Sequence, residues 1–332
     1  MDSSDEGMTV RRVRVMAAAA LTAALLTSCV RPVDVQSSDV EAPVSTQAVP
    51  PATSTGSGHN ATQPPLHESD LPSTLRVAIT FDQPGVGLRE GGKFTGIDAD
   101  IARYIAGHLG VPQISFVEAV ADQRETLLAT RQADLVLASY SMTPARADKV
   151  TFAGPYLNTG QELLVSARSS IRTPRQLRGF TVCSVQGSTS TSELVKDHPG
   201  LHLTVQPRVS DCVALLEQGK VKAVTSDAAI LQGFVKASRA PDKLRLSGAP
   251  FSPEHWGVAM RRADVDLCKD VSAALAKMVE SGAWKRAVRD NLGDSSAVGA
   301  RTLTPPKPRP CPAPRLNATT ATTTLAPGSS PG

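Results

Sequence analysis

The sequence predicts an α/β protein built around parallel strands. Short apolar runs that are typical of buried strands alternate with segments of helical periodicity or with helix-start signals. A repeated β-α-β order implies a parallel sheet with right-handed crossovers. The order occurs in two successive blocks, and about 225 residues lie between the Pro-, Ser- and Thr-rich ends of the chain. That length is enough for two modest lobes.

Residues 1–29 have the layout of an export signal. Three arginines between positions 11 and 14 precede a small apolar run, 15–26, which is short for a bilayer span. The Leu-Thr-Ser-Cys sequence at 26–29 resembles the lipobox of bacterial lipoproteins, whose cysteine is acylated and becomes the first mature residue. We therefore expect a lipoprotein signal peptide and lipidation of Cys29. A retained anchor or a plain secretory signal are the alternatives.

Two segments predict disorder. Residues 30–71 and 294–332 are rich in Pro, Ser and Thr and contain no aromatic residue. Such segments cannot bury enough apolar surface to offset the entropy lost on ordering. We expect a disordered tether over the first and a disordered tail over the second. The formal net charge of +4 is small for 332 residues and argues against a nucleic-acid-binding protein.

The first block contains one β-α-β-α-β unit. Its helix 97–109 is predicted by isoleucine or leucine at every fourth position and ends at Gly110. The strands are predicted by short apolar runs. In order, the expected elements are a strand over 75–80, a turn-rich segment over 82–87, the helix 97–109, a strand over 114–117, a helix over 124–130 and a strand over 135–138.

The second block repeats this order. Pro174 favours the first turn of a short helix, and Ser210 can cap another. The expected strands are 163–165, 180–185, 203–205, 223–227 and 256–260. The expected helices begin near 174, 189 and 210, and two more, over 265–281 and 283–292, close the domain.

The segment 139–149 is the first candidate for a ligand site. It follows a predicted strand, at the end where ligands bind in open α/β sheets. Ser141 or Thr143 can cap a helix that begins at Pro144, and the free N–H groups of such a start favour an anion. Arg146 adds a planar fork of donors that fits a carboxylate or a phosphate. An ordinary strand-to-helix connection with a surface arginine is the alternative.

Five motifs together resemble those of the bacterial extracellular solute-binding proteins, family 3. They occur, in the family's order, at 96–102 (GFDVDLA in the family), 141–146 (TxTxxR), 152–156 (FSxPY), 186–189 and 226–227. The turn 81–85 is most similar to that of glutamate-binding lipoproteins of ABC uptake systems. The resemblance covers about 72–293.

The resemblance implies a periplasmic-binding-protein-like fold of type II. This fold has two α/β lobes joined by two hinge strands, with an amino acid bound in the cleft between the lobes. Here it implies one lobe from 72–166 plus 254–293 and a second from 167–253.

The resemblance also implies a site that binds both charged ends of a free amino acid. Asp227 matches the carboxylate that binds the α-ammonium group. The α-carboxylate would be bound by the family's arginine and by nearby donors, which match Arg146, Ser141, Thr143, Ser188 and Thr189. Helix capping is the alternative role for Asp227 and Thr189.

The side chain of the ligand needs further contacts. Arg124 lies where glutamate and aspartate binders of this family carry a ligand arginine, and Ser139 matches a nearby hydroxyl position. Arg89 and Lys93 are weaker candidates, and Phe81 is the candidate for covering the carbon chain of the ligand. If Arg124 is a solvated residue at a helix start, glutamine or asparagine fits as well as glutamate.

The cysteines indicate disulfides. Besides Cys29 there are four, and the export signal leads to an oxidising compartment. We pair Cys183 with Cys212, both in the second implied lobe, and Cys268 with Cys311, although three pairings are possible. There is no Cys-x-x-Cys and the six histidines are scattered, so we expect no metal and no cofactor.

The expected function is an extracytoplasmic amino-acid-binding protein, monomeric and lipid-anchored to the cell membrane. Its ligand would be glutamate, glutamine, aspartate or asparagine, delivered to an ABC permease. A sensor that docks on a membrane signalling partner is the alternative. An enzyme on the same fold ranks third, because the sequence has no Gly-x-Ser-x-Gly, His-Glu-x-x-His or phosphate loop.

Overall fold

The structure is a computed structural model that describes residues 72–238, 241–248, 250–293 and 302–313. The expected signal peptide, the tether and Cys29 lie outside the described residues. Among the helices that are described, none has the length and apolar character needed to cross a membrane.

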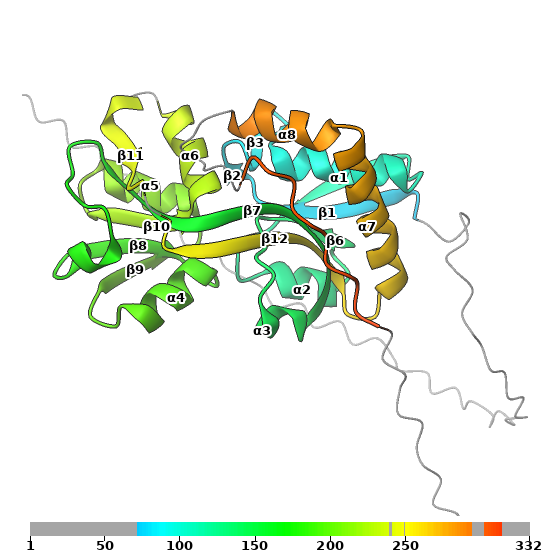
Figure 1. The fold of residues 1–332 in the computed structure, drawn as a ribbon, viewed down its shortest axis with the longest axis horizontal. Helices are drawn as coiled ribbons and strands as arrows, with labels where there is room; N and C mark the ends of the chain where they lie inside the picture. The colour runs from blue at the N-terminus through cyan, green and yellow to red at the C-terminus, as the bar shows by residue number, and fades with distance from the viewer. Residues whose placement is uncertain (1–71, 239–240, 249, 294–301, 314–332) are drawn as a thin grey trace, which may run out of the picture. The chain divides into compact units, whose positions relative to one another are not determined.

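A nine-stranded mixed sheet organises the described residues (Figure 1). The strand order is β5-β1-β6-β12-β7-β10-β8-β9, and β11 also pairs with β7. The bounds are β1 Thr74–Ile79, β5 Gln113–Glu118, β6 Leu135–Val136, β7 Val150–Ser166, β8 Thr181–Val185, β9 His202–Gln206, β10 Ala223–Asp227, β11 Leu244–Leu246 and β12 Ser252–Arg261.

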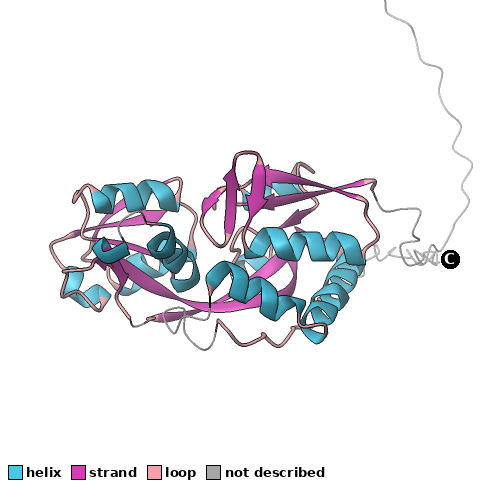
Figure 2. Cartoon of the chain, turned by 90° about the horizontal axis from the view of Figure 1, so that it is seen from above, coloured by secondary structure: helices cyan, strands magenta, loops and turns pink. Residues whose placement is uncertain are grey.

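The two ends of the sheet are parallel, as the sequence predicts. Strand β1 runs parallel to β5 and β6, and β8 runs parallel to β9 and β10. In the middle, β7 and β12 pair antiparallel with each other over most of the length of β12. These two long strands connect the two ends, which is the predicted two-lobed fold with two crossings (Figures 1 and 2).

Helices cover both ends of the sheet. Lobe 1 holds β1, β5, β6, α1, α2, α3, α7 and α8, and lobe 2 holds β8 to β11 and α4 to α6. The helix bounds are α1 Ile97–His108, α2 Arg124–Ala129, α3 Pro144–Ala147, α4 Thr189–Asp197, α5 Val209–Glu217, α6 Ala228–Ala237, α7 Val265–Glu280 and α8 Ala283–Leu292; the 3₁₀ turns are η2 Pro174–Leu177 and η3 Pro241–Lys243.

The first crossing lies inside β7. This strand pairs with β12 up to Gln161 and with β10 from Gln161 onward. We therefore propose that the lobes meet near Gln161 rather than at the predicted boundary of 166. The sequence predicts only 163–165 as a strand here, because Gly154, Pro155 and Gly160 interrupt the strand pattern before it. Burial along almost the whole of β7 compensates for these weak strand formers.

Three local features differ from the predictions. The turn-rich segment 82–87 contains a turn at 84–86, but its ends belong to a small antiparallel sheet of β2 (Asp82–Gln83), β3 (Gly87–Glu90) and β4 (Lys93–Thr95). Helix α5 is capped by Arg208, not Ser210, whose N–H instead donates to Asp82 of lobe 1. The elements α6 and β11 were not predicted.

Both predicted disulfides are present. Cys183 pairs with Cys212 inside lobe 2, and Cys268 pairs with Cys311. The second bond holds residues 302–313, the red segment of Figure 1, against lobe 1, where the Arg309 N–H also donates to the carbonyl oxygen of Gly154 at 2.7 Å. The prediction of disorder over 294–332 is therefore wrong for this segment; the rest of the predicted tail lies outside the described residues.

A buried carboxylate connects three elements of lobe 1. Asp98, at the start of α1, accepts hydrogen bonds from the Tyr156 hydroxyl of β7 at 2.6 Å and from the Ser139 N–H at 3.0 Å. Ala138 and Ser139 have left-handed φ values of 42° and 45°, which non-glycine residues seldom adopt. The hydrogen bond to Asp98 therefore stabilises the backbone conformation from which the candidate ligand segment starts.

Burial raises the pKa of Asp98 to about 7, although its two hydrogen bonds act in the opposite direction. We expect Asp98→Ala to lower the free energy of unfolding by about 2–4 kcal/mol, because it leaves two buried donors without an acceptor. Urea unfolding followed by circular dichroism measures the change. Asp98→Asn keeps one acceptor and should lose less; a loss below about 1 kcal/mol for the alanine variant would contradict this role.

Candidate functional site

A small pocket lies between the lobes, beside the carboxyl ends of β6 and β10. Its volume is about 40 Å³, and its walls come from both lobes. Seven of the predicted ligand-binding residues line it: Arg124, Ser139, Ser141, Arg146, Ser188, Thr189 and Asp227. Chain segments that are distant in the sequence therefore bring two guanidinium groups, one carboxylate and several hydroxyl groups to one place.

The guanidinium groups of both arginines lie over the same aromatic ring. The guanidinium carbon of Arg124 lies 4.2 Å from the ring centroid of Tyr140, and that of Arg146 lies 4.7 Å from it. Both distances are in the range of cation–π interactions. The Tyr140 hydroxyl donates to Glu125 at 2.9 Å, which fixes the ring. Tyr140 therefore holds the two positive groups close together.

Both guanidinium groups donate hydrogen bonds to backbone carbonyl oxygens. Arg124 donates to Ala121 and Ala138 at 2.8 and 3.1 Å, and Arg146 donates to Ser141 at 3.0 Å. Both also reach across to the Gly187 carbonyl of lobe 2, at 3.3 and 3.0 Å. Within the described part of the chain, no carboxylate forms an ion pair with either group.

Both guanidinium groups are cationic at neutral pH. Burial lowers the pKa of Arg124 to about 9, and the charge of Arg146 acts in the same direction. Burial also lowers the pKa of Arg146. Two adjacent positive charges with only neutral acceptors favour binding of an anion, because an anion would supply the missing opposite charge.

Asp227 supplies the negative charge of the pocket. It ends β10, is 4% exposed, and accepts a hydrogen bond from Trp256 Nε1 at 2.5 Å. Burial, followed by the negative charge of Glu254, raises its pKa well above the ordinary value. Asp227 occupies the N-cap position of α6, but its side chain makes no capping hydrogen bond. A cation beside Asp227 would stabilise its ionised form.

Lobe 2 adds the start of α4. Ser188 is the N-cap, and its hydroxyl accepts from the Thr191 N–H at 3.1 Å. Thr189 and Ser190 follow in the first turn and line the same pocket. The first N–H groups of a helix have no partner inside the helix, so this terminus can donate to an anion.

Four predicted residues do not line the pocket: Thr143, Phe81, Arg89 and the weaker candidate Lys93, which is exposed at the start of β4. Thr143 caps α3, and its hydroxyl accepts from the Arg146 N–H at 3.3 Å, so it positions the arginine instead. The Phe81 ring packs on Phe94 at 5.1 Å, and Arg89 lies over both rings at 5.7 Å. Phe81, the candidate for covering the ligand, and Arg89, a weaker candidate for the second cation, are therefore turned toward each other and not toward the pocket.

Sequence reasoning missed several residues of the site, three of which act on its polar groups. Gln83 lines the pocket, and its side chain accepts from the Ser139 hydroxyl at 3.4 Å. Tyr140 and Trp256 position the charged groups. Gln83 lies in the turn 81–85 and Tyr140 in the candidate segment 139–149, whereas no local pattern connects Trp256 with Asp227.

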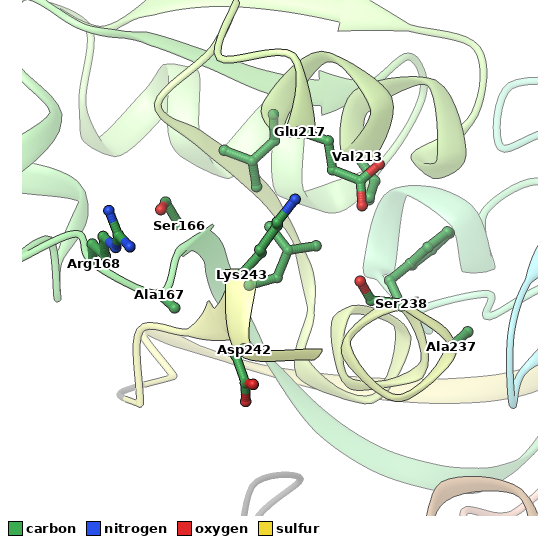
Figure 3. A pocket seen from close by; sticks show the side chains of 12 residues that line it. Ser166, Ala167, Arg168, Val213, Glu217, Ala237, Ser238, Asp242 and Lys243 are labelled. Atoms are coloured by element: carbon green, nitrogen blue, oxygen red, sulfur yellow. The ribbon is translucent and has the colours of Figure 1, made fainter. Parts of the chain in front are cut away.

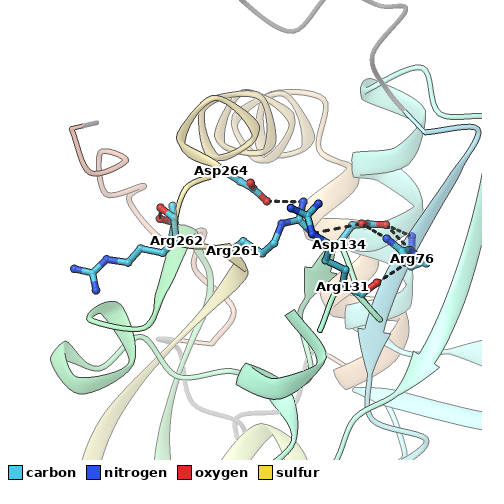
Figure 4. Close-up of polar contacts among 7 residues, drawn as sticks. Arg76, Arg131, Asp134, Arg261, Arg262 and Asp264 are labelled. Carbon is cyan, nitrogen blue, oxygen red and sulfur yellow. Dashed lines mark hydrogen bonds and ion pairs between the residues drawn. The ribbon is translucent and has the colours of Figure 1, made fainter. Parts of the chain in front are cut away.

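Other hollows and charged clusters do not form a comparable site. A hollow of about 870 Å³ lies on lobe 2 beside α5, α6 and η3 (Figure 3), but its charges are of both signs and do not converge. In lobe 1, Asp134 binds Arg76 at 2.7 Å, and Arg261 bridges Asp134 and Asp264 (Figure 4). These opposite charges form ion pairs with one another, so we assign the cluster a role in the stability of the fold.

Known proteins share this architecture. Residues 75–294 match the family model described as bacterial extracellular solute-binding proteins, family 3. The glutamate-binding protein GluB of Corynebacterium efficiens is 34% identical over 236 residues, which cover 68% of this chain and 80% of that protein. The ABC transporter glutamine-binding protein GlnH of Bacillus subtilis is 30% identical over 196 residues, covering 58% and 71%. A solved structure of an ancestral arginine-binding protein bound to glutamine superposes with a TM-score of 0.64 at 29% identity, covering 68% of this chain and 100% of that one.

The raised pKa of Asp227 predicts a pH-dependent stability. The folded state binds the proton of Asp227 more tightly than the unfolded state, so this group lowers the free energy of unfolding as the pH rises above about 4. Asp227→Asn cannot ionise and retains an acceptor for Trp256. Between about pH 4.5 and 7.5, we expect the wild type to lose more unfolding free energy than this variant.

Urea unfolding at both pH values measures the difference. The exposed Asp290→Asn is the matched control and should follow the wild type. Identical pH profiles for wild type and Asp227→Asn would contradict the assignment.

Proposed function

Because the chain belongs to the bacterial extracellular solute-binding proteins, family 3, we propose that it is an extracytoplasmic protein that binds one free amino acid between its lobes and delivers it to an ABC permease. The observation that supports this most is the pocket itself, which is lined by one buried and one partly buried guanidinium group, both without an ion-pair partner among the described residues, and by one buried carboxylate. A free amino acid carries both opposite charges on neighbouring atoms, and each end would find its complement there.

Each end of the ligand has a proposed partner. Arg146 and the start of α4 bind the α-carboxylate, with Ser141 as a further hydroxyl donor. Asp227, which is positioned by the hydrogen bond from Trp256, binds the α-ammonium group. Closure of the lobes removes water from both charged pairs, which strengthens their attraction.

We propose glutamate as the ligand. The charged groups that line the pocket are two cations, Arg124 and Arg146, and one anion, Asp227. Their sum is one positive charge, which glutamate, with two carboxylates and one ammonium group, neutralises. Arg124 and Ser139 would bind the side-chain carboxylate. The similarity to a protein named for glutamate supports this choice, and the similarity to a glutamine-binding protein makes glutamine the nearest competitor.

The remaining parts of the proposal come from the sequence. A lipid on Cys29 would hold the chain at the outer side of the cell membrane, with 30–71 as a tether. We propose that the protein acts as a monomer and catalyses no reaction, in keeping with the relatives that are named as binding proteins.

A thermal-shift screen of residues 30–332 with the common amino acids tests the function. A ligand at a hundred times its dissociation constant adds about 2.7 kcal/mol of stability. We expect the largest shift with glutamate. A larger shift with glutamine or aspartate would identify that amino acid as the ligand in place of glutamate. No shift with any amino acid would overturn the proposal.

The role of Arg146 predicts a loss of affinity for every amino acid that binds. Arg146→Ala leaves a buried carboxylate of the ligand without its partner, which costs about 3–5 kcal/mol, or at least a hundredfold in the dissociation constant. Titration calorimetry measures this, with the exposed Arg178→Ala as control. A loss below about threefold would remove Arg146 from the site.

The role of Arg124 predicts a change of specificity. Arg124→Gln removes the second cation but keeps a neutral hydrogen-bond donor on a shorter side chain. Glutamate should bind far more weakly to this variant, whereas the affinity for glutamine should change little, because glutamine has no second carboxylate. Equal losses for the two ligands would show that Arg124 does not bind the side-chain carboxylate.

A further inference from the structure

The lobes contact each other directly outside the pocket, and at one point there is no room for a side chain. Gly233 of α6, in lobe 2, lies against the loop between β2 and β3 of lobe 1. A Cβ atom on Gly233 would be 1.9 Å from the carbonyl oxygen of Pro84 and 2.9 Å from its carbonyl carbon. Those are backbone atoms, so the neighbour cannot move aside without a shift of the loop or of the lobe.

The local conformation does not explain this glycine. Gly233 lies in the interior of α6, at a φ that any residue can adopt. Glycine costs about 1 kcal/mol relative to alanine at such a position. The close approach of lobe 1 is therefore the feature of the structure that requires glycine here.

A second contact lies beside the first. Asp82, in β2 of lobe 1, accepts a hydrogen bond from the Ser210 N–H in the first turn of α5 at 3.1 Å. The N-cap residue of α5, Arg208, makes no side-chain capping bond. A residue of lobe 1 thus caps a helix of lobe 2, and separation of the lobes would remove that cap.

A third contact completes the set. Arg208 binds Glu118 at the end of β5, with Nη2 and Oε1 2.5 Å apart. Both side chains are about 40% exposed, so this ion pair contributes less than the other two contacts. The three contacts are adjacent to pocket-lining residues, since Gln83 lies between Asp82 and Pro84, and Val209 lies between Arg208 and Ser210.

We infer that these residues form a closure contact, by which the two lobes hold the closed form without touching the ligand. It consists of Asp82, Pro84 and Glu118 in lobe 1 and of Arg208, Ser210 and Gly233 in lobe 2. The inference depends on the proposed function, because it requires that the lobes separate to admit an amino acid.

The closure contact changes the affinity of the protein for all its ligands by the same factor, so it leaves the specificity unchanged. A ligand binds in proportion to the population of the closed form that it needs. A change that destabilises only this form weakens every ligand by the same factor, in contrast to a change in Arg124.

Gly233→Ala tests the inference. Alanine favours the helix in the open form, where Pro84 is distant, and clashes only in the closed form. We expect the dissociation constant for the preferred amino acid, and that for the next-best ligand, to rise by the same factor of about tenfold or more. The melting temperature without ligand should be unchanged or higher.

The chain offers a matched control. Gly107 lies in α1 and has an ordinary φ, and a Cβ atom added there would have no neighbour within 4 Å. The Gly107→Ala variant should therefore bind like the wild type. Asp82→Ala is a second variant that removes the cap without adding an atom, and it should weaken binding several-fold without lowering the ligand-free melting temperature.

The outcomes separate the two proposals. If the wild type binds an amino acid and both Gly233→Ala and Asp82→Ala bind it within about twofold of the wild type, the closure contact is refuted and the function stands. Unequal losses for the two ligands also refute it, because the contact would then shape the pocket. If the wild type binds no amino acid, both proposals fail.

Discussion

Two positive charges held side by side on one tyrosine ring are the feature on which the site depends. Arg124 and Arg146 lie 4.2 and 4.7 Å from the ring centroid of Tyr140, and their hydrogen bonds go to neutral carbonyls. In water such a pair would separate, since like charges repel and long side chains are mobile. Here burial, the aromatic ring and fixed carbonyls keep the pair in place, so the repulsion is already present before an anion binds. An anion that neutralises the pair gains this energy, which explains why the pocket favours a ligand with carboxylate groups.

The fold supplies the precision that this arrangement needs. Tyr140 and Ser141 follow two residues with left-handed backbone, and Asp98 fixes that backbone through the Ser139 N–H. The same carboxylate accepts from Tyr156 in β7, the strand that passes into lobe 2. One buried group therefore connects a helix of lobe 1, the segment that carries Tyr140 and Arg146, and the strand that joins the lobes.

The sequence predicts those parts of the site that lie in short contiguous motifs. Ser141 and Arg146 follow a predicted strand and Asp227 ends one, and the structure brings all three to one pocket. Phe81 and Arg89 do not line the pocket. Arg89 pairs with Phe94 between β3 and β4, and Phe81, just before β2, packs on the same ring. The sequence does not reveal this, because strands as short as β2 to β4 are below the length at which alternation is recognisable. The bond between Trp256 and Asp227 joins strands that are far apart in sequence, so no local pattern can reveal it. The antiparallel centre of the sheet is not predicted either, because glycine and proline interrupt the strand pattern of β7.

The contact of both arginines with Gly187 gives the proposed binding a way to couple to lobe closure. Its carbonyl oxygen, on lobe 2, accepts from Arg124 and from Arg146. A ligand carboxylate presents the same kind of acceptor to the same donors, and hydrogen bonds to an ionised acceptor are roughly twice as strong as those to a neutral one. In the proposed function, binding would exchange a weak bridge between the lobes for a stronger one through the ligand, and the gain would be the difference between the two. The contacts at Asp82 and Gly233 would take no part in this exchange, because they lie outside the pocket. We therefore propose that the chemistry of the pocket selects the ligand, while the fit of backbone against backbone beside it sets how strongly closure favours the bound state.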